Sequence, residues 1–303
     1  MTGASRGIGN FAAELMLRDD ADLHLVVTTR GHGDDLVAQL GRDSGNRNVS
    51  WVDAELSSLA SVRAATGEII SRLASGALPP LNGFVGNAGL QMTSANRSTG
   101  DGIETTFAVN VLANQLFLRL LADQFTAPAR IVITTSDTHF GDFRHNMGMV
   151  PAPQWRSPRD LMTPGTTAAT DTLTAGRTAY STSKLAVIHL VHEFARHLPA
   201  GVDIYSWNPG FVPGTGLARD ASAVQRFAMK HVMPLMTLTP LSVSAKTAGQ
   251  HLAQLMRHKS RRKAVLTSAW PRRSHPPPSP TTPTANGNSG RRATNCPPSP
   301  EPR

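Results

Sequence analysis

Short runs of consecutive apolar residues alternate along the chain with longer stretches in which apolar residues recur at helical spacing. The runs begin at His24 (HLVVTT), Gly83 (GFVG), Arg130 (RIVITT) and Val202 (VDIYSW), with a weaker one at Val49 (VSWV). Continuous apolar runs are typical of strands that are buried on both faces, and helices between such strands imply parallel crossovers. The pattern therefore predicts a doubly wound α/β fold with a parallel sheet.

Three stretches have the apolar spacing of amphipathic helices: residues 58–73, 101–125 and 180–198. Residues 137–178 break the alternation with a segment rich in Pro, Thr and Gly. A connection of this length is too long for a plain loop in a compact domain, and such loops usually serve a function. We therefore expect residues 137–178 to take part in a binding site.

The composition changes near Trp270, after which Pro, Ser, Thr, Arg and Asn dominate and aliphatic residues are almost absent. Such a segment has too little apolar surface to form a core. We predict one domain over residues 1–265, followed by a tail over 266–303 that is either disordered or the product of reading out of frame. A shift of frame within 257–263 would explain the change.

The formal net charge of +9 is concentrated at the C-terminal end. From Arg257 onward there are ten Lys or Arg and one acid, Glu301, so the preceding part has 20 basic and 20 acidic residues. A formally neutral body argues against a nucleic-acid partner, because nucleic-acid binding domains carry a basic surface. The arginine pairs of the tail have no aromatic residues between them, so they are interpreted as solvated.

Three further features bear on location. Cys296 is the only cysteine, so a disulfide framework is excluded and a reducing compartment is favoured. No charged segment followed by an apolar one marks the start of the sequence as a signal peptide, and no apolar run reaches the 18 residues that a membrane span needs. We expect a cytoplasmic protein without a membrane span.

Candidate binding residues follow directly after the predicted strands. Ligands of an open parallel sheet bind beyond the carboxyl ends of its strands. The strand-end signals are Asn87-Ala88-Gly89 after GFVG, Ser136 after RIVITT, and Asn208-Pro209-Gly210 after VDIYSW. The sequence TGASRGIG at residues 2–9 has the glycines of a tight turn that brings a pyrophosphate to a helix N-terminus. Together they predict a dinucleotide site.

Tyr180 and Lys184, in YSTSK, are four residues apart and therefore lie on the same face of a helix. A nearby ammonium group stabilises a phenolate, so we expect Lys184 to lower the pKa of Tyr180 and allow it to act as a general acid or base. HEFARH at residues 192–197 places its histidines five residues apart, on different helix faces, so no metal site is expected.

In this order, TGASRGIG, NAG, Ser136, YSTSK and NPG resemble the short-chain dehydrogenase/reductase family, over residues 1 to about 255. The resemblance implies a Rossmann-like fold. TGDGIETTFAVN, SDTH and the wide gap between Ser136 and Tyr180 are similar to the retinol dehydrogenase and protochlorophyllide reductase-like branch. The family reaction is hydride transfer between a nicotinamide cofactor and a carbonyl or alcohol, without a metal.

The resemblance also implies a role for each catalytic position. Tyr180 would protonate the substrate oxygen, and Ser136 would hydrogen-bond that oxygen. Lys184 would hold the nicotinamide ribose and lower the pKa of Tyr180, while Asn110 would anchor a water molecule that relays protons to Lys184. The implied cofactor-binding residues are Gly3, Ser5, Arg6, Gly7, Ile8, Gly9, Arg30, Glu55, Leu56, Asn87, Ala88, Gly89, Asn110, Tyr180, Lys184, Pro209, Gly210, Val212 and Thr215.

The residues that would distinguish NADP from NAD favour NADP(H). An NAD enzyme places a carboxylate at the end of the second strand to bind the ribose 2′-hydroxyl, whereas this strand ends in Thr28-Thr29-Arg30. Arg30 and Arg6 have the forked donors that suit a 2′-phosphate. Two positions depart from the family pattern: Glu55 replaces an Asp that holds the adenine, and PGFVPGTGL is one residue longer than usual at Thr215.

Three alternatives remain at this point: a non-catalytic dinucleotide-fold protein, a basic-tail interaction protein, and an inactive, incomplete gene product. Met1 stands where the glycine motif usually has an aliphatic residue, which leads us to expect that translation begins upstream and that the sheet lacks its first strand as written. The substrate is expected to be a small, hydrophobic carbonyl or alcohol. The sequence leaves the substrate's identity and the oligomeric state open.

Overall fold

The computed structural model describes residues 1–146, 148–166, 171–213, 242–257 and 267–268, and its strands form a parallel arrangement. The strands are β1 (Leu25–Thr29), β2 (Val49–Asp53), β3 (Leu81–Gly86), β4 (Phe125–Thr134), β5 (Val202–Asn208) and β6 (Thr267–Ser268). They pair in the orders β1-β2 and β3-β4-β5-β6, and every pair is parallel. The predicted doubly wound α/β fold is confirmed, including the weaker run at Val49.

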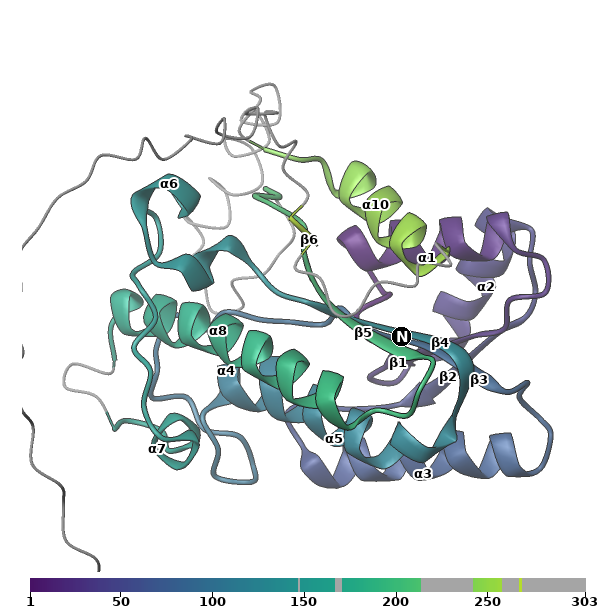
Figure 1. Ribbon diagram of the computed structural model, residues 1–303, viewed down its shortest axis with the longest axis horizontal. Coiled ribbons are helices and arrows are strands. Elements are labelled where there is room, and N and C mark those ends of the chain that lie inside the picture. Colours follow the sequence, from purple (N-terminus) through teal and green to yellow (C-terminus); the bar gives the residue numbers. More distant parts are fainter. Residues whose placement is uncertain (147, 167–170, 214–241, 258–266, 269–303) are drawn as a thin grey trace, which may run out of the picture. The chain divides into compact units, whose positions relative to one another are not determined.

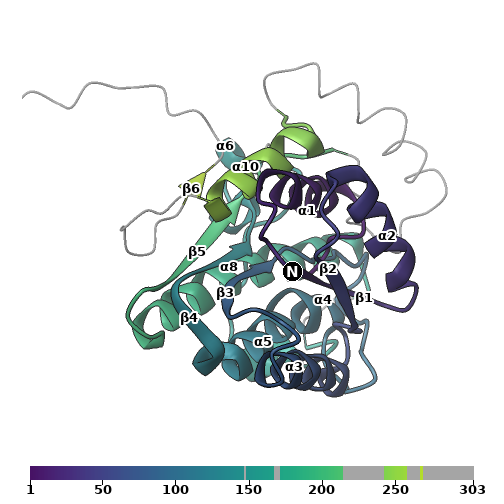
Figure 2. The ribbon, with the colours of Figure 1, turned by 90° about the vertical axis from the view of Figure 1, so that its right-hand side faces the viewer.

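Helices cover both faces of these strands (Figures 1 and 2). They are α1 (Gly7–Asp19), α2 (Gly33–Ser44), α3 (Leu59–Ala74), α4 (Thr105–Phe107), the π-helical η1 (Ala108–Leu112), α5 (Ala113–Leu121), η2 (Ala122–Gln124), η3 (Asp137–Phe140), α6 (Phe143–Asn146), α7 (Pro158–Met162), α8 (Leu173–His197) and α10 (Ala245–Arg257). Helices α1, α2 and α10 lie on one face, and α3, α5 and α8 on the other. The long segment 137–178 contains η3, α6, α7 and the beginning of α8.

Side chains of β4 show why the strand runs are continuously apolar. Ile131 and Ile133 pack in the cluster formed with α3, α5 and α8, while Val132 packs in the opposite cluster with α1 and α10. All three are fully buried. Burying an aliphatic side chain contributes about 1.5–3 kcal/mol, so both faces of this strand stabilise the fold.

The sheet is divided between β1 and β3, and only the first two residues lie in the gap. The Thr2 amide donates to the Val85 carbonyl at 2.9 Å, and the Thr28 amide donates to the Met1 carbonyl at 2.9 Å. Thr2 also forms an isolated parallel bridge with Gly86. The start of the sequence therefore lies in the middle of the sheet, at the point marked N in Figure 2.

At the other edge, β6 pairs in parallel with Trp207 and Asn208 of β5. The sequence did not suggest a strand here, and β6 lies just beyond the boundary predicted at residue 265. Apart from residues 267–268, the predicted tail over 266–303 lies outside the described residues.

One helical stretch has the length and composition of a membrane span. Thr105–Gln124 reaches a mean hydropathy of 1.2, and 61% of that window is buried inside the structure. The sequence reading had found no apolar run of this length, because polar residues interrupt the stretch. Burial of this extent is equally typical of the core helix that α5 forms against α3.

Candidate active site

The glycine-rich turn before α1 is built by close backbone contacts. Gly3 has φ +70°, and a Cβ there would lie 2.8 Å from the Ala88 amide nitrogen. A Cβ at Gly9 would lie 2.0 Å from the Gly3 carbonyl oxygen. Gly7 has φ +57°, a conformation that favours glycine. The turn thus leaves the N-terminus of α1 open for an anionic group.

Asn87 ties this turn to the neighbouring strands. Its Nδ2 donates to the Gly3 carbonyl at 3.2 Å, and its Oδ1 accepts from Thr134 Oγ1 at 3.3 Å. The Ala88 amide in turn donates to Thr2 Oγ1 at 3.0 Å. These bonds hold the ends of β3 and β4 against the turn.

A cavity of about 960 Å³ runs along the carboxyl ends of the strands. Most of the residues predicted for the site line it: Gly3, Ser5, Arg6, Gly7, Ile8, Arg30, Glu55, Leu56, Asn87, Ala88, Gly89, Ser136, Tyr180, Lys184, Pro209, Gly210 and Val212. Gly9 and Asn110 do not line it, because both are buried behind its wall. Thr215 lies outside the described residues. The residues that line the cavity extend from the glycine turn to Tyr180.

Tyr180 and Lys184 both project from α8 into the cavity and are almost fully buried. Ser136 lines the same cavity and is close enough to the Tyr180 hydroxyl to lower its pKa. Lys184 Nζ lies 5.6 Å from the centre of the Tyr180 ring and donates to the Thr134 carbonyl at 3.0 Å. The structure therefore brings together the three residues Ser136, Tyr180 and Lys184 from distant parts of the sequence.

The expected pKa of Tyr180 was wrong for this structure. Burial raises the pKa of the phenol to about 12, and Ser136 opposes this only in part. Burial lowers the pKa of Lys184 to about 8, so the lysine loses its proton more easily than in water. Desolvation disfavours the charged form of both groups, and here it outweighs the stabilisation of the phenolate expected from Lys184.

Asn110 lies in η1, and its side chain is fully engaged. Its Oδ1 accepts from the Leu90 amide, and its Nδ2 donates to the Leu90 carbonyl and to Ser183 Oγ, each at 2.9 Å. Its backbone carbonyl accepts from Asn114 Nδ2 at 2.9 Å. Single π-helical turns often occur at functional sites. These bonds fix the loop after β3 against α8, and the expected water relay stays a prediction.

At the other end of the cavity, Arg30 and Glu55 form an ion pair. Arg30 Nη1 donates to Glu55 Oε2 at 3.2 Å, and both side chains are exposed. Glu55 Oε1 also accepts from the Ser57 amide and hydroxyl. Partial burial raises the pKa of Glu55. The hydrogen bonds from Ser57 and the charge of Arg30 lower it by more, so the pKa lies below its usual range. Asp53, at the end of β2, accepts from the Gly31 amide at 3.1 Å.

The sequence reading missed several residues at the Tyr180 end of the cavity. They are Met92, Thr93, Asp137, His145, Asn146, Met149, Val150, Leu173 and Arg177. Most belong to residues 137–178, which were expected to be functional without individual assignments. His139 places its ring against Phe140 at 4.1 Å and bonds the Ser136 carbonyl.

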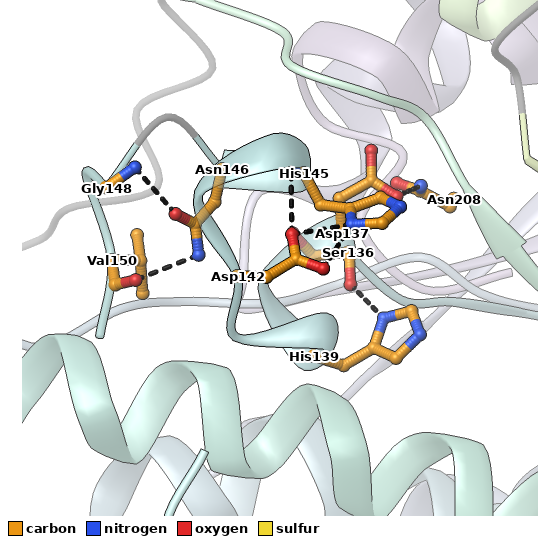
Figure 3. A network of polar contacts seen from close by, with 9 residues as sticks. All are labelled: Ser136, Asp137, His139, Asp142, His145, Asn146, Gly148, Val150 and Asn208. Atoms are coloured by element: carbon orange, nitrogen blue, oxygen red, sulfur yellow. Dashed lines mark hydrogen bonds and ion pairs between the residues drawn. The ribbon is translucent and has the colours of Figure 1, made fainter. Parts of the chain in front are cut away.

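Figure 3 shows the polar contacts around this end. Asn208 Nδ2 at the end of β5 donates to Asp137 Oδ1, which links the β4 and β5 ends. His145 Nδ1 bonds Asp142 Oδ1 at 2.6 Å, and the His145 ring stacks on Phe140 at 4.0 Å. Burial raises the pKa of Asp137, although His145 and His139 oppose the shift.

These features define a doubly wound α/β protein with a glycine-rich turn of the dinucleotide-binding type. Residues 1–147 match the family model for short chain dehydrogenases. The chain is similar to the short-chain dehydrogenase/reductase family and, within it, to the retinol dehydrogenase-like branch.

The matches to individual proteins agree with this assignment. Retinol dehydrogenase 12 of Mus musculus is 28% identical over 70% of this chain and 60% of its own length. Human dehydrogenase/reductase SDR family member 13 is 28% identical over 69% of this chain and 50% of its own length. The chain thus spans only about half to three fifths of these relatives.

Among solved structures, a short chain dehydrogenase from Burkholderia cenocepacia in complex with NADP has a TM-score of 0.58 and 23% identity. The match covers 84% of this chain and 88% of that one. A blue fluorescent protein from a metagenomic library, in complex with NADPH, also has a TM-score of 0.58, with 21% identity over 84% of this chain. These similarities support the fold.

Proposed function

We propose that the protein is an NADP(H)-dependent oxidoreductase that transfers hydride between the nicotinamide and a carbonyl or alcohol. The observation that carries the proposal is that Ser136, Tyr180 and Lys184 line the same cavity as the glycine turn. The nicotinamide supplies the hydride, so the protein must supply orientation and a proton. The residues of this cavity are sufficient for both tasks.

In the reduction direction, Tyr180 is the proton donor. With a pKa of about 12 the phenol is protonated at neutral pH, so its Oη holds a proton for the carbonyl oxygen. Ser136 Oγ would hydrogen-bond the same oxygen and polarise the substrate carbonyl. Lys184, with a pKa of about 8, carries a positive charge at neutral pH and stabilises negative charge that develops on Tyr180.

Two features support binding of NADP(H). The open Gly7 backbone and the N-terminus of α1 suit a pyrophosphate, and Arg6 and Arg30 line the same end of the cavity. The short chain dehydrogenase from Burkholderia cenocepacia, which is similar in fold, is described in complex with NADP.

We also propose a cytoplasmic location and a small-molecule substrate.

The decisive experiment replaces Tyr180 with Phe and compares it with Tyr205→Phe, since these are the only two tyrosines. Tyr205 is also buried, but it packs beside α10 on the other face of the sheet. We expect Tyr180→Phe to reduce carbonyl turnover at least about 100-fold, because general acid catalysis typically contributes that much, while NADPH affinity stays nearly unchanged. Tyr205→Phe should retain turnover.

Stopped-flow measurement of NADPH oxidation and fluorescence titration of NADPH provide the two readouts. Substantial turnover by a folded Tyr180→Phe variant contradicts the proton-donor role. Tight NADPH binding by the wild type without turnover of any carbonyl or alcohol would instead favour the alternative, a non-catalytic dinucleotide-binding protein.

A further inference from the structure

Arg177 is the cation that the proposed reaction does not use. It lies in α8, three residues before Tyr180, and both residues line the same cavity. Residues three apart on a helix have Cβ atoms about 5–6 Å apart on one face. Arg177 therefore shares a helix face with Tyr180, and its long side chain can reach a substrate whose carbonyl meets Tyr180.

Within the part of the chain that the structure describes, Arg177 makes no hydrogen bond or ion pair, although it is half-buried. The acid at this end, Asp137, accepts instead from Asn208, and the titratable groups near it are His145, His139 and Asp142. Figure 3 shows these groups together. Asp137 thus leaves the charge of Arg177 available to a ligand.

Apolar side chains supply part of the remaining lining of this end, beside polar ones. Met92, Met149, Val150 and Leu173 contribute to the wall, and none of them carries a charge. A partly desolvated guanidinium is a strong donor for a planar oxyanion such as a carboxylate, which it can bind through two parallel hydrogen bonds. The lining therefore combines one anion-binding group with surface for a hydrocarbon body.

We infer that the substrate is an oxo acid or its hydroxy-acid counterpart, with an apolar body and a carboxylate that Arg177 binds a few bonds from the reacting carbon. This inference rests on the proposed function and specifies its substrate class. Arg177 would bind and orient the substrate without exchanging a proton, so its contribution should appear chiefly in KM for acidic substrates.

The test compares pairs of substrates in the presence of NADPH. Alkyl and aryl 2-oxo and 4-oxo carboxylic acids are measured against their methyl esters, which keep the carbonyl and remove the charge. We expect the wild type to prefer the acid by tenfold or more in kcat/KM, in line with a charge-assisted contact. Arg177→Met should reduce this acid-to-ester ratio at least tenfold, and Arg177→Lys should restore part of it.

Arg119→Met is the matched control, because Arg119 is exposed on α5 and lies outside the cavity lining. It should keep the wild-type ratio. Circular dichroism melting and NADPH titration show whether each variant is folded and binds cofactor.

The outcomes separate the two proposals. Reduction of acids and esters with equal efficiency by the wild type overturns the inference and leaves the oxidoreductase function standing. An acid preference that survives in folded Arg177→Met also overturns it, since another group must then bind the carboxylate. Hydride transfer to neither member of any pair overturns the oxidoreductase function together with the inference.

Discussion

At the residue scale, the ion pair of Arg30 with Glu55 bears most directly on cofactor choice. The exposed pair crosses from the end of β1 to the segment after β2 and lines the cavity. A 2′-phosphate on the cofactor would bind Arg30 while Glu55 is also paired with it. The Glu55 carboxylate would at the same time hold the Arg30 guanidinium in position. Screening by solvent keeps the pair itself weak, so the arginine remains available.

Replacing Arg30 with Asp is expected to reverse or abolish the preference for NADPH over NADH. The change removes a phosphate donor and supplies the carboxylate that binds a ribose 2′-hydroxyl. One charge-assisted contact of about 1.5–3 kcal/mol corresponds to about tenfold or more in affinity. Titration of both cofactors by fluorescence measures the effect. Arg42→Asp, an exposed position on α2 outside the cavity, is the control, and unchanged affinities for Arg30→Asp contradict the assignment.

At the scale of elements, Glu104 determines how the helical stretch that contains Asn110 begins. Its carboxylate accepts from the Thr106 amide at 2.9 Å and the Phe107 amide at 2.7 Å, and only 4% of the residue is exposed. The Glu104 amide donates to the Met162 carbonyl, which connects this helix start to α7. Glu104 therefore connects the long segment 137–178 to the helical stretch that contains Asn110.

Glu104 should make the stability of the protein depend on pH. Burial raises its pKa from 4.5 to about 7. Between pH 4.5 and 7 the folded state then holds the Glu104 proton while the unfolded state has lost it. The contribution of Glu104 to the free energy of unfolding is therefore fully present below pH 4.5 and is lost as the pH rises through 7. Glu104→Gln removes this titration. From pH 5 to 8 we expect the unfolding free energy of wild type minus that of Glu104→Gln to fall by roughly 2–3 kcal/mol.

Urea denaturation at pH 5, 6, 7 and 8 measures this difference. Glu193→Gln, on the exposed surface of α8, is the matched control and should show a nearly constant difference. A constant difference for Glu104→Gln as well would show that the carboxyl is not buried as described.

At the scale of the whole molecule, the divided sheet is the main departure from a regular doubly wound fold. Among the described residues, Met1 and Thr2 connect β1-β2 with β3-β4-β5-β6 through backbone hydrogen bonds. Main-chain groups along the amino-terminal parts of β1 and β3 therefore face a gap that could hold a parallel strand. The division lies beside the glycine turn, so it also affects how firmly the cofactor site is held.

We predict that four β-branched residues joined to Met1 will stabilise the protein. The added segment can pair with β1 and β3 and bury aliphatic side chains, each worth about 1.5–3 kcal/mol. An increase of about 3 kcal/mol or more should raise Tm by roughly 6–12 °C. Thermal melting measures the shift, and an extension by four Gly and Ser residues is the control. Equal melting temperatures for the two extensions contradict the prediction.

The sequence alone predicted much of the fold and the site, because those features depend on local patterns. Strands buried on both faces must be continuously apolar, as Ile131 to Ile133 are, and this pattern is visible without the tertiary structure. Gly3 and Gly7 mark a turn with positive φ, which glycine favours. Tyr180 and Lys184 share a face because helical geometry requires it.

The remaining features depend on contacts between distant segments. The pairing of Arg30 with Glu55 joins positions 25 residues apart, and Asp137 meets Asn208 across 71 residues. The strand β6 is only two residues long and depends on β5 for its pairing. Arg177 could not be assigned to the site until the structure placed it on the cavity wall. Such encounters leave no periodic pattern in the sequence.

What the sequence determined by itself is the fold class and the candidate site residues, since apolar periodicity encodes the first and short local motifs mark the second. Only the tertiary structure decided the protonation of Tyr180 and Lys184, because burial shifts a pKa according to the surrounding chain rather than to the nearest residues. The tertiary structure also decided which charged side chains of the cavity lining are already paired with each other. In the proposed function, those two properties bear on proton transfer and on the choice of substrate.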